Sequence, residues 1–202
     1  MQKVFIATSR PVGEQCIAWA KKNTPSGFEL VQNIQESDII ISVLYNKIFT
    51  RDQLSDKEAF NFHPGTLPEY KGVGINTWVL INGESKTGST LHKISPGIDT
   101  GDIIEIRQFL ISKKDTAHSL FEKNNKIIFK MFKDWYNDLL NNNYEAEPQN
   151  KNVGRNYRLK DLQAAKNLTR YAKAFHFPNK ESAFYYNDKS QKIYLNYLTE
   201  EK

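Results

Sequence analysis

The sequence predicts an α/β protein built on an open, mostly parallel sheet. Residues 38–44 (DIIISVL) form a nearly continuous aliphatic run, which is typical of a parallel strand covered on both faces. Strand, helix and strand patterns follow one another before that run, which is the order of an α/β fold. The length of 202 residues suits one domain with a small C-terminal appendage.

The N-terminal half of this sheet is expected to be short. Residues 4–7 and 28–31 read as strands, and residues 14–22 read as a helix that follows a break at residues 10–13 (RPVG). Only the first 60 residues precede Asn61, which leaves room for three strands and one convincing helix. We therefore expect a Rossmann-like sheet that lacks one βα unit or has it much shortened.

The next stretch completes the predicted catalytic domain, residues 1–142. A helix over 75–81 should end at Asn82-Gly83, because glycine favours the left-handed conformation that closes a helix. A long helix is expected over 116–140, capped by Asp115 or Thr116. Short strands are expected at 59–62, 88–94 and 102–110, the last two joined by a turn at 95–97.

A C-terminal subdomain is expected over residues 143–202, after a polar linker that begins at Asn141. Residues 162–174 read as a helix, and residues 184–186 and 193–195 read as a β-hairpin. The region is basic, with Lys151, Arg155, Arg158, Lys160, Lys166, Arg170, Lys173 and Lys180.

The composition indicates a globular protein but does not indicate its function. Hydrophobic residues make up 39% of the chain and charged residues 25%, as in globular proteins. The net charge of +5 gives a mild attraction to anions, and this alone does not choose among nucleotides, nucleic acid and acidic membranes. The single cysteine, Cys16, cannot form an internal disulfide, and no signal peptide or membrane span is apparent. A cytoplasmic location is expected.

The first chemically informative stretch is residues 61–72 (NFHPGTLPEYKG). Side chains alternate along a strand, so Asn61 and His63 should point the same way. They lie where a strand of the open sheet ends, which is where ligands bind in such folds. On its own, an Asn-x-His pair is more often a structural hydrogen-bonded pair than a catalytic one.

A second stretch, residues 91–102 (LHKISPGIDTGD), places Asp99 in a glycine-rich turn between two expected strands. On its own, this is a hairpin turn in which the aspartate side chain bonds to nearby backbone.

Together the two stretches resemble the folate-dependent formyltransferase family. The resemblance rests on Asn61-x-His63-Pro64-Gly65, on Leu67-Pro68-x-Tyr70-Lys71-Gly72, on Gly88-x-Thr90-x-His92 and on Gly97-Ile98-Asp99-Thr100-Gly101. It covers residues 38–110 well and the remainder loosely. It implies an enzyme that transfers the formyl group of 10-formyltetrahydrofolate to an amine.

The resemblance implies that Asn61, His63 and Asp99 are catalytic. Asn61 would donate a hydrogen bond to the oxyanion, and His63 would share that task or accept the proton of the amine. Asp99 would orient His63 through a water molecule. No metal is expected, because the histidines show no paired ligand spacing and no cysteine cluster exists. His92 and His118 are interpreted as structural.

The resemblance also implies a folate site beside residues 38–49. Leu44, Tyr45, Asn46 and Ile48 match the segment that contacts the pterin in this family. Gly97 and Ile98, which precede Asp99, are assigned to the same site.

Within the family, the chain is most similar to the nucleotide-sugar N-formyltransferases. The acceptor would be the amine of a 4-amino- or 3-amino-dideoxysugar linked to a nucleotide, with dTDP expected, and destined for surface polysaccharide or O-antigen. A homodimer through the C-terminal module is a further possibility. The candidate nucleotide-sugar contacts are Arg10 and Lys71 for the diphosphate, Tyr70 and Phe177 for stacking, and Asn76 and Trp78.

Other functions stay open at this point. Glycinamide ribonucleotide formyltransferase is similar in length, but Pro11 and a single glycine replace its glycine-rich phosphate loop. The tRNA-binding barrel of the methionyl-tRNA enzyme needs more chain than follows residue 110. A non-catalytic RNA-binding protein would use the basic region 151–180 with Tyr157, Tyr171 and Phe175, but it would give no reason for Asn61, His63 and Asp99.

Overall fold

A computed structural model of the chain has a six-stranded mixed sheet at its centre. The strand order is β2-β1-β3-β4-β6-β7. Its strands are β1 (Gln2–Thr8), β2 (Phe28–Leu30), β3 (Ile39–Val43), β4 (Glu58–His63), β6 (Lys86–Lys93) and β7 (Ile103–Leu110). The structure describes residues 1–150, 152–158, 172, 174 and 177, and the backbone of residues 184–186 and 192–194.

The first four strands of the sheet are parallel, and β6 and β7 add an antiparallel edge. The run at residues 38–44 forms β3, which is buried along its whole length between β1 and β4. The predicted α/β class with a mostly parallel open sheet is therefore confirmed. The shortened N-terminal half is also present, because only the short helix α2 (Arg51–Leu54) connects β3 to β4.

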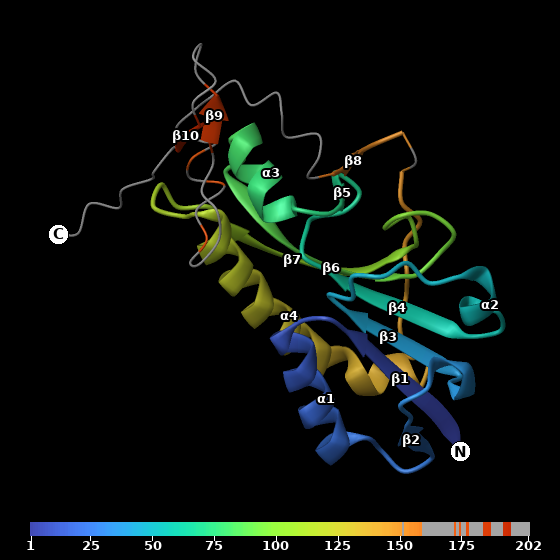
Figure 1. The fold of residues 1–202 in the computed structure, drawn as a ribbon. Helices are drawn as coiled ribbons and strands as arrows, with labels where there is room; N and C mark the ends of the chain where they lie inside the picture. Colours follow the sequence, from blue (N-terminus) through green and yellow to red (C-terminus); the bar gives the residue numbers. More distant parts are fainter. Residues whose placement is uncertain are drawn as a thin grey trace.

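Two helices cover one face of this sheet (Figure 1). They are α1 (Pro11–Asn23) and α4 (Ala117–Leu140), which pack on each other and on the strands. The main core lies between these helices and the sheet, where Phe60 and Phe62 of β4 meet Phe132 of α4. Burial of this many large apolar side chains is the main stabilisation of the domain.

The first helix begins earlier than the sequence predicted. Residues 10–13 were expected to be a break before a helix at residue 14, but α1 starts at Pro11. Proline is well suited to a first helical position, because the backbone N–H that it lacks would have no partner inside the helix. Gly13 is needed there because a Cβ would overlap the Thr8 side chain. The chain therefore passes from β1, which ends at Thr8, into α1 after only two residues.

Both later helices end or begin as the sequence predicted. Helix α3 (Ile75–Asn82) closes on Gly83, which is left-handed at φ 72° and donates its N–H to Leu80 and Val79. Thr116 caps α4, with its side chain accepting from the Ser119 N–H. The 3₁₀ turn η1 (Ile34–Glu36) has no buried residue and was not predicted.

A second, two-stranded sheet was not predicted. Strand β5 (Tyr70–Gly72) pairs in parallel with β8 (Arg155–Tyr157). The segment that leads from α4 to β8, orange in Figure 1, runs past the turn between β6 and β7. Residues 147–150 and 152–157, expected as part of the C-terminal subdomain, thus lie against the loops that surround Asp99.

The expected C-terminal hairpin is present as β9 (Phe184–Tyr186) paired antiparallel with β10 (Lys192–Tyr194). The expected helix at 162–174 and most of the basic residues of 151–180 lie outside the described residues; Ala172 and Ala174 are helical. Within the described part of the chain, no helix has the length and apolarity that a membrane crossing requires.

Candidate active site

The site lies on the sheet face opposite α1 and α4. Phe60 and Phe62 point into the core, so the alternating residues Asn61 and His63 point to the other face. Strand β6 pairs antiparallel with β4, and its residue His92 stands directly opposite Asn61. The ladder between β4 and β6 therefore places Asn61, His63 and His92 side by side with fixed spacing.

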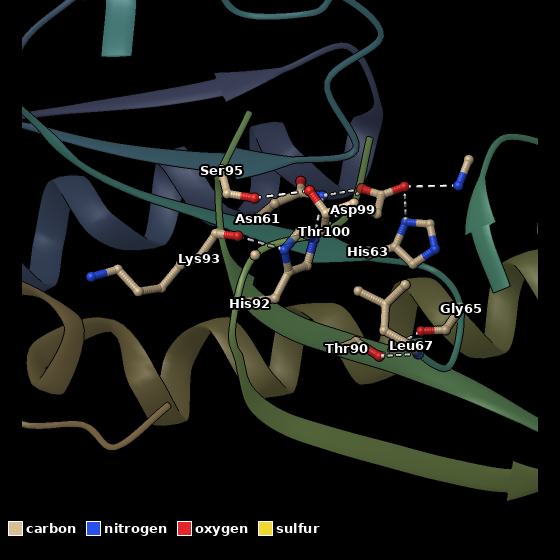
Figure 2. Close-up of polar contacts among 12 residues, drawn as sticks. Asn61, His63, Gly65, Leu67, Thr90, His92, Lys93, Ser95, Asp99 and Thr100 are labelled. Carbon is tan, nitrogen blue, oxygen red and sulfur yellow. Dashed lines mark hydrogen bonds and ion pairs between the residues drawn. The ribbon is translucent and has the colours of Figure 1, made fainter. Parts of the chain in front are cut away.

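Asp99 reaches the same place from the turn between β6 and β7. Its Oδ1 lies 3.3 Å from Asn61 Nδ2, and its Oδ2 lies 3.4 Å from His63 Nδ1 (Figure 2). Its Oδ2 also accepts the Gly72 N–H at 2.8 Å. The sequence predicted that Asn61, His63 and Asp99 would meet, and they do. The expected water between Asp99 and His63 is not needed, because the two side chains are in direct reach of each other.

His92 fixes the orientation of the Asn61 amide. Its Nδ1 lies 2.7 Å from the Lys93 carbonyl, which can only accept, so Nδ1 carries a hydrogen. In the neutral ring, Nε2 is then an acceptor, and it lies 3.1 Å from Asn61 Nδ2. Both hydrogens of Nδ2 are thus directed to acceptors, His92 Nε2 and Asp99 Oδ1. A flipped amide would point its oxygen at these same two acceptors, which is unfavourable.

His63 is almost completely buried, with 3% of its side chain exposed. Its Nε2 lies 2.7 Å from the Tyr70 carbonyl and must donate to it. The lone pair of the neutral ring is therefore on Nδ1, the nitrogen that faces Asp99. His63 has no nitrogen left for a direct contact with solvent, while the Asp99 side chain is 13% exposed.

The two titratable partners have shifted pKa values. Burial lowers the pKa of His63 below its usual value, and this outweighs the raising effects of the Asp99 charge and of the Tyr70 hydrogen bond. For Asp99, burial alone would raise the pKa. The nearby His63 and His92 rings and the hydrogen bond from the Gly72 N–H outweigh it and hold the pKa well below the usual range. At neutral pH the pair is thus a neutral imidazole beside a carboxylate.

The predicted folate segment follows β3 directly. Leu44, at φ 51°, packs against the main core, and the Tyr45 ring stacks on a neighbouring phenylalanine ring at 5.2 Å. Asn46 is tied to the turn after β1, because Ser9 Oγ donates to its Oδ1 at 2.7 Å. Ile48 is 82% exposed. Among the described residues, no hydrogen bond joins this segment to Asp99 or its partners.

Gly97 and Ile98 lie on the Asp99 turn and are both exposed. Gly97 has φ 120°, a conformation that favours glycine. Ile98 is 45% exposed, and Val73, which follows the Gly72 donor, is 58% exposed. An exposed apolar side chain therefore lies on the turn that carries Asp99, and another lies next to the Gly72 donor.

Two of the predicted nucleotide-sugar residues are cationic. Arg10 is exposed at the N-cap of α1, at the end of the sheet to which β1 leads. Lys71 lies on β5 next to the Gly72 donor, and its Nζ donates to the Val153 carbonyl at 3.3 Å.

The other four predicted contacts are packed into the protein. Tyr70 is buried, donates to Glu84 at 2.6 Å and stacks on the Tyr157 ring. It reaches the site through its backbone carbonyl instead of its ring. Asn76 accepts from the buried Asn124 at 2.7 Å. Trp78 and Phe177 pack with the core cluster around α3.

Two side chains that contact the predicted trio were not assigned to the site from the sequence, and neither was the backbone donor Gly72. His92 was interpreted as structural, yet its pairing opposite Asn61 could have been found from the antiparallel register of β4 and β6. Gln149 donates to the Asp99 carbonyl at 3.0 Å from a segment 50 residues further along the chain. No local pattern marks that contact.

The arrangement places an amide donor and a neutral imidazole on the two oxygens of one carboxylate, at 3.3 Å and 3.4 Å. Such a set can stabilise an oxyanion and move a proton, which is the chemistry of acyl transfer to an amine. Within the described residues, no group of three or more His, Cys, Asp or Glu is placed to hold a metal ion. A surface hollow of about 470 Å³ lies elsewhere, at the amino ends of the strands beside Asp38 and Glu58.

The relatives found by comparison with known proteins include a nucleotide-sugar N-formyltransferase. The GDP-perosamine N-formyltransferase of Brucella melitensis is 31% identical over 137 residues, which are 61% of this chain and 52% of that protein. The chain thus spans about half the length of this relative.

Solved structures share the fold. A sugar N-formyltransferase from Shewanella superposes with a TM-score of 0.82 over 100% of this chain and 99% of that one, at 19% identity. The N-formyltransferase of Helicobacter canadensis, solved with folinic acid and dTDP-3-aminofucose, gives a TM-score of 0.71 at 24% identity, over 84% of this chain and 74% of that one.

A family model described as formyl transferase matches residues 9–132, more than half of the 202-residue chain, and this range includes Asn61, His63, His92 and Asp99. The chain therefore belongs to the formyl transferase family.

Proposed function

We propose that this protein is an N-formyltransferase that moves the formyl group of 10-formyltetrahydrofolate to the amine of a nucleotide-linked amino sugar. The acceptor that we propose is a 4-amino- or 3-amino-dideoxysugar on dTDP, which is used for a surface polysaccharide such as O-antigen. The reaction that we propose takes place in the cytoplasm. The observation that carries the proposal is the cluster of Asn61, His63 and Asp99, in which Asp99 touches both of the other side chains.

Attack by the amine begins the reaction. The neutral nitrogen bonds to the formyl carbon, and the carbonyl oxygen becomes an oxyanion. Asn61 Nδ2 is the proposed donor to this oxygen. Its bond to Asp99 is the longer of its two contacts, 3.3 Å against 3.1 Å to His92, so the formyl oxygen would take the place of Asp99 as acceptor.

The proton leaves through the pair of Asp99 and His63. The attacking nitrogen carries an excess proton, and Asp99 is the more exposed member of the pair that can accept it. The proton is then held between Asp99 Oδ2 and the lone pair of His63 Nδ1. When the bond between the formyl carbon and the folate nitrogen breaks, that nitrogen takes up the proton, and tetrahydrofolate and a formamide leave. In this scheme His63 is not the direct base, because its buried ring receives the proton through Asp99.

The sugar-nucleotide assignment draws on the relatives. The Brucella relative bears the name of a GDP-sugar enzyme, and the Helicobacter structure holds a dTDP-sugar, so the nucleotide has to be tested. The exposed Arg10, at the amino end of α1, is the cation that we propose for the diphosphate, since a helix N-terminus also favours an anion. The apolar Ile98 and Val73 beside Asp99 suit the ring faces of a bound folate.

The test uses the full chain with 10-formyltetrahydrofolate and a panel of dTDP-, GDP- and UDP-linked amino sugars that carry the amine at C3 or C4. Glycinamide ribonucleotide is included as a further acceptor, and binding of single-stranded RNA is measured separately. Mass spectrometry of each nucleotide sugar detects the added formyl group. The proposal expects one nucleotide and one amine position to be strongly preferred. Product formed on glycinamide ribonucleotide alone would move the protein to purine synthesis. Binding of single-stranded RNA without any formyl transfer would indicate the non-catalytic alternative.

A further inference from the structure

The segment after α4 is hydrogen-bonded to two loops that contact each other at Asp99. One is the turn between β6 and β7, which carries Asp99, and the other is the segment from β4 to β5. The backbone of Glu147 pairs with Ile103 in both directions at 2.8 Å, immediately after the Asp99 turn. Further along, the Arg155 N–H donates to the Glu69 carbonyl at 3.1 Å, and β8 pairs with β5. We call residues 147–150 and 152–157 the strap. Its path is visible in Figure 1 as the orange segment beside the green turn.

Gln149 is the side chain of the strap that reaches the Asp99 turn. Its Nε2 donates to the Asp99 carbonyl at 3.0 Å and to the Gly101 carbonyl at 2.6 Å. The two hydrogens of one amide thus clamp the backbone on both sides of Thr100. The side chains within the turn add weaker support, because the contacts from Thr100 to Ser95 and to the Pro96 carbonyl are exposed to solvent.

The clamp acts on a strained residue. Asp99 has φ 52°, in the left-handed region that costs free energy for residues with a Cβ. Such a conformation persists only where the surroundings hold it in place. The Gln149 amide supplies part of that restraint from outside the turn.

The strap restrains the carboxylate as well. Gly72 donates its N–H to Asp99 Oδ2, and Gly72 belongs to β5, whose partner strand is β8. The strap packs closely against the segment before β5, because a Cβ on Gly154 of the strap would overlap the Pro68 carbonyl oxygen. One continuous segment therefore holds the Asp99 backbone directly and the Asp99 side chain through β5.

We infer that Gln149 is a positioning residue, which holds the Asp99 backbone so that the carboxylate stays within reach of both His63 and Asn61. The inference rests on the proposed function only for its effect on turnover. Without the two Gln149 bonds the strained turn relaxes, and the 3.4 Å contact between Asp99 and His63 lengthens. Because the Asp99 charge raises the pKa of His63, the His63 pKa then falls further.

The activity test compares Gln149→Met with wild type. Methionine keeps an unbranched side chain of similar length and removes both donors without adding a charge. We expect kcat to fall by roughly 10-fold to 100-fold, as misplaced catalytic groups do, with KM for both substrates changed by less than about twofold. Gln108→Met, at an exposed position of β7, is the matched control and should behave as wild type.

A second measurement does not depend on activity. NMR titration of the His63 ring, over the pH range in which the protein stays folded, should give a lower pKa in Gln149→Met than in wild type and in Gln108→Met. If wild type transfers no formyl group, the proposed function fails, and this titration still decides the role of Gln149. If Gln149→Met does not fold, Gln149→Asn, whose shorter amide cannot reach both carbonyls, takes its place. An unchanged His63 titration together with turnover within about twofold of wild type would overturn the inference.

Discussion

Asn61, His63 and His92 are held in a different way from Asp99. The first three lie on β4 and β6, where paired strands fix the backbone and the neighbouring core is buried. Asp99 lies on a turn, in a strained conformation, and is held by single contacts from Gly72 and Gln149. The difference shows that the strand-borne half of the site is set by the sheet, while the other half depends on individual donors.

This contrast has a consequence for dynamics. Hydrogen bonds in the centre of a sheet open only when much of the domain unfolds, whereas a surface turn can open locally at a smaller cost. A substitution on the strands should therefore change chemistry at a fixed geometry. A substitution that removes a contact holding the turn in place should change the geometry itself.

The largest effect is expected for Asp99→Asn. Asparagine tolerates the left-handed conformation, so the variant removes the charge and keeps the turn. Turnover should fall by roughly two to four orders of magnitude, because the proton from the amine loses its first acceptor. The control is Asp56→Asn, because Asp56 is also an aspartate in the left-handed conformation but is exposed and lies outside the site. Turnover measured by mass spectrometry that stays near normal in Asp99→Asn would remove the proposed mechanism.

A large change in pH dependence is expected for His63→Asn. The neutral ring is the active form, and burial lowers the His63 pKa below its usual value of about 6.5. With saturating substrate, turnover of wild type should thus rise with pH through the region below about 6.5 and then level off. His63→Asn should lose most of this rise. Profiles of the same shape in both proteins would exclude His63 from the proton path.

The same variant has a stability readout. The folded His63 resists protonation, while the unfolded chain takes up a proton as the pH falls below about 6.5. The free energy of unfolding of wild type should therefore decrease between pH 7 and pH 5 by more than that of His63→Asn. Urea unfolding at the two pH values measures the difference.

A smaller effect on turnover is expected for His92→Phe. Phenylalanine fills a similar space but cannot accept the Asn61 hydrogen bond, so the Asn61 amide loses the partner that orients it. We expect kcat to fall by roughly 10-fold to 100-fold with little change in KM. His118→Phe, in the first turn of α4, is the control among the histidines first interpreted as structural. Equal turnover in the two variants would return His92 to a purely structural role.

The last comparison concerns stability, at two glycines that share a positive φ. Gly27 has open space around its Cβ position, so Gly27→Ala should cost only conformational strain, about 1 kcal/mol of stability. Gly154→Ala adds an overlap with the Pro68 carbonyl and should cost more, roughly 2–4 kcal/mol, or detach the strap. Urea unfolding and turnover together distinguish these results. Equal stability of the two variants would show that the strap is not tightly packed.

Local sequence patterns determined most of the fold. The aliphatic run of β3, the glycine that closes α3 and the threonine that caps α4 are each readable from a few neighbouring residues. Strand alternation also placed Asn61 and His63 on one face, and the family resemblance added Asp99. Each of these features depends on interactions close in sequence, or on a motif whose members keep their order.

Contacts between distant parts of the chain were decided only by the tertiary structure. The partner of β5 is β8, which lies more than eighty residues further along, and Gln149 reaches Asp99 across 50 residues. Burial of Tyr70 and Asn76, both expected as substrate contacts, depends likewise on Tyr157 and Asn124. A sequence states which residues can form hydrogen bonds and bury apolar surface. Which partner satisfies each of them, and which ring nitrogen of His63 faces Asp99, is settled by packing in three dimensions, because most buried polar groups find their donor or acceptor there.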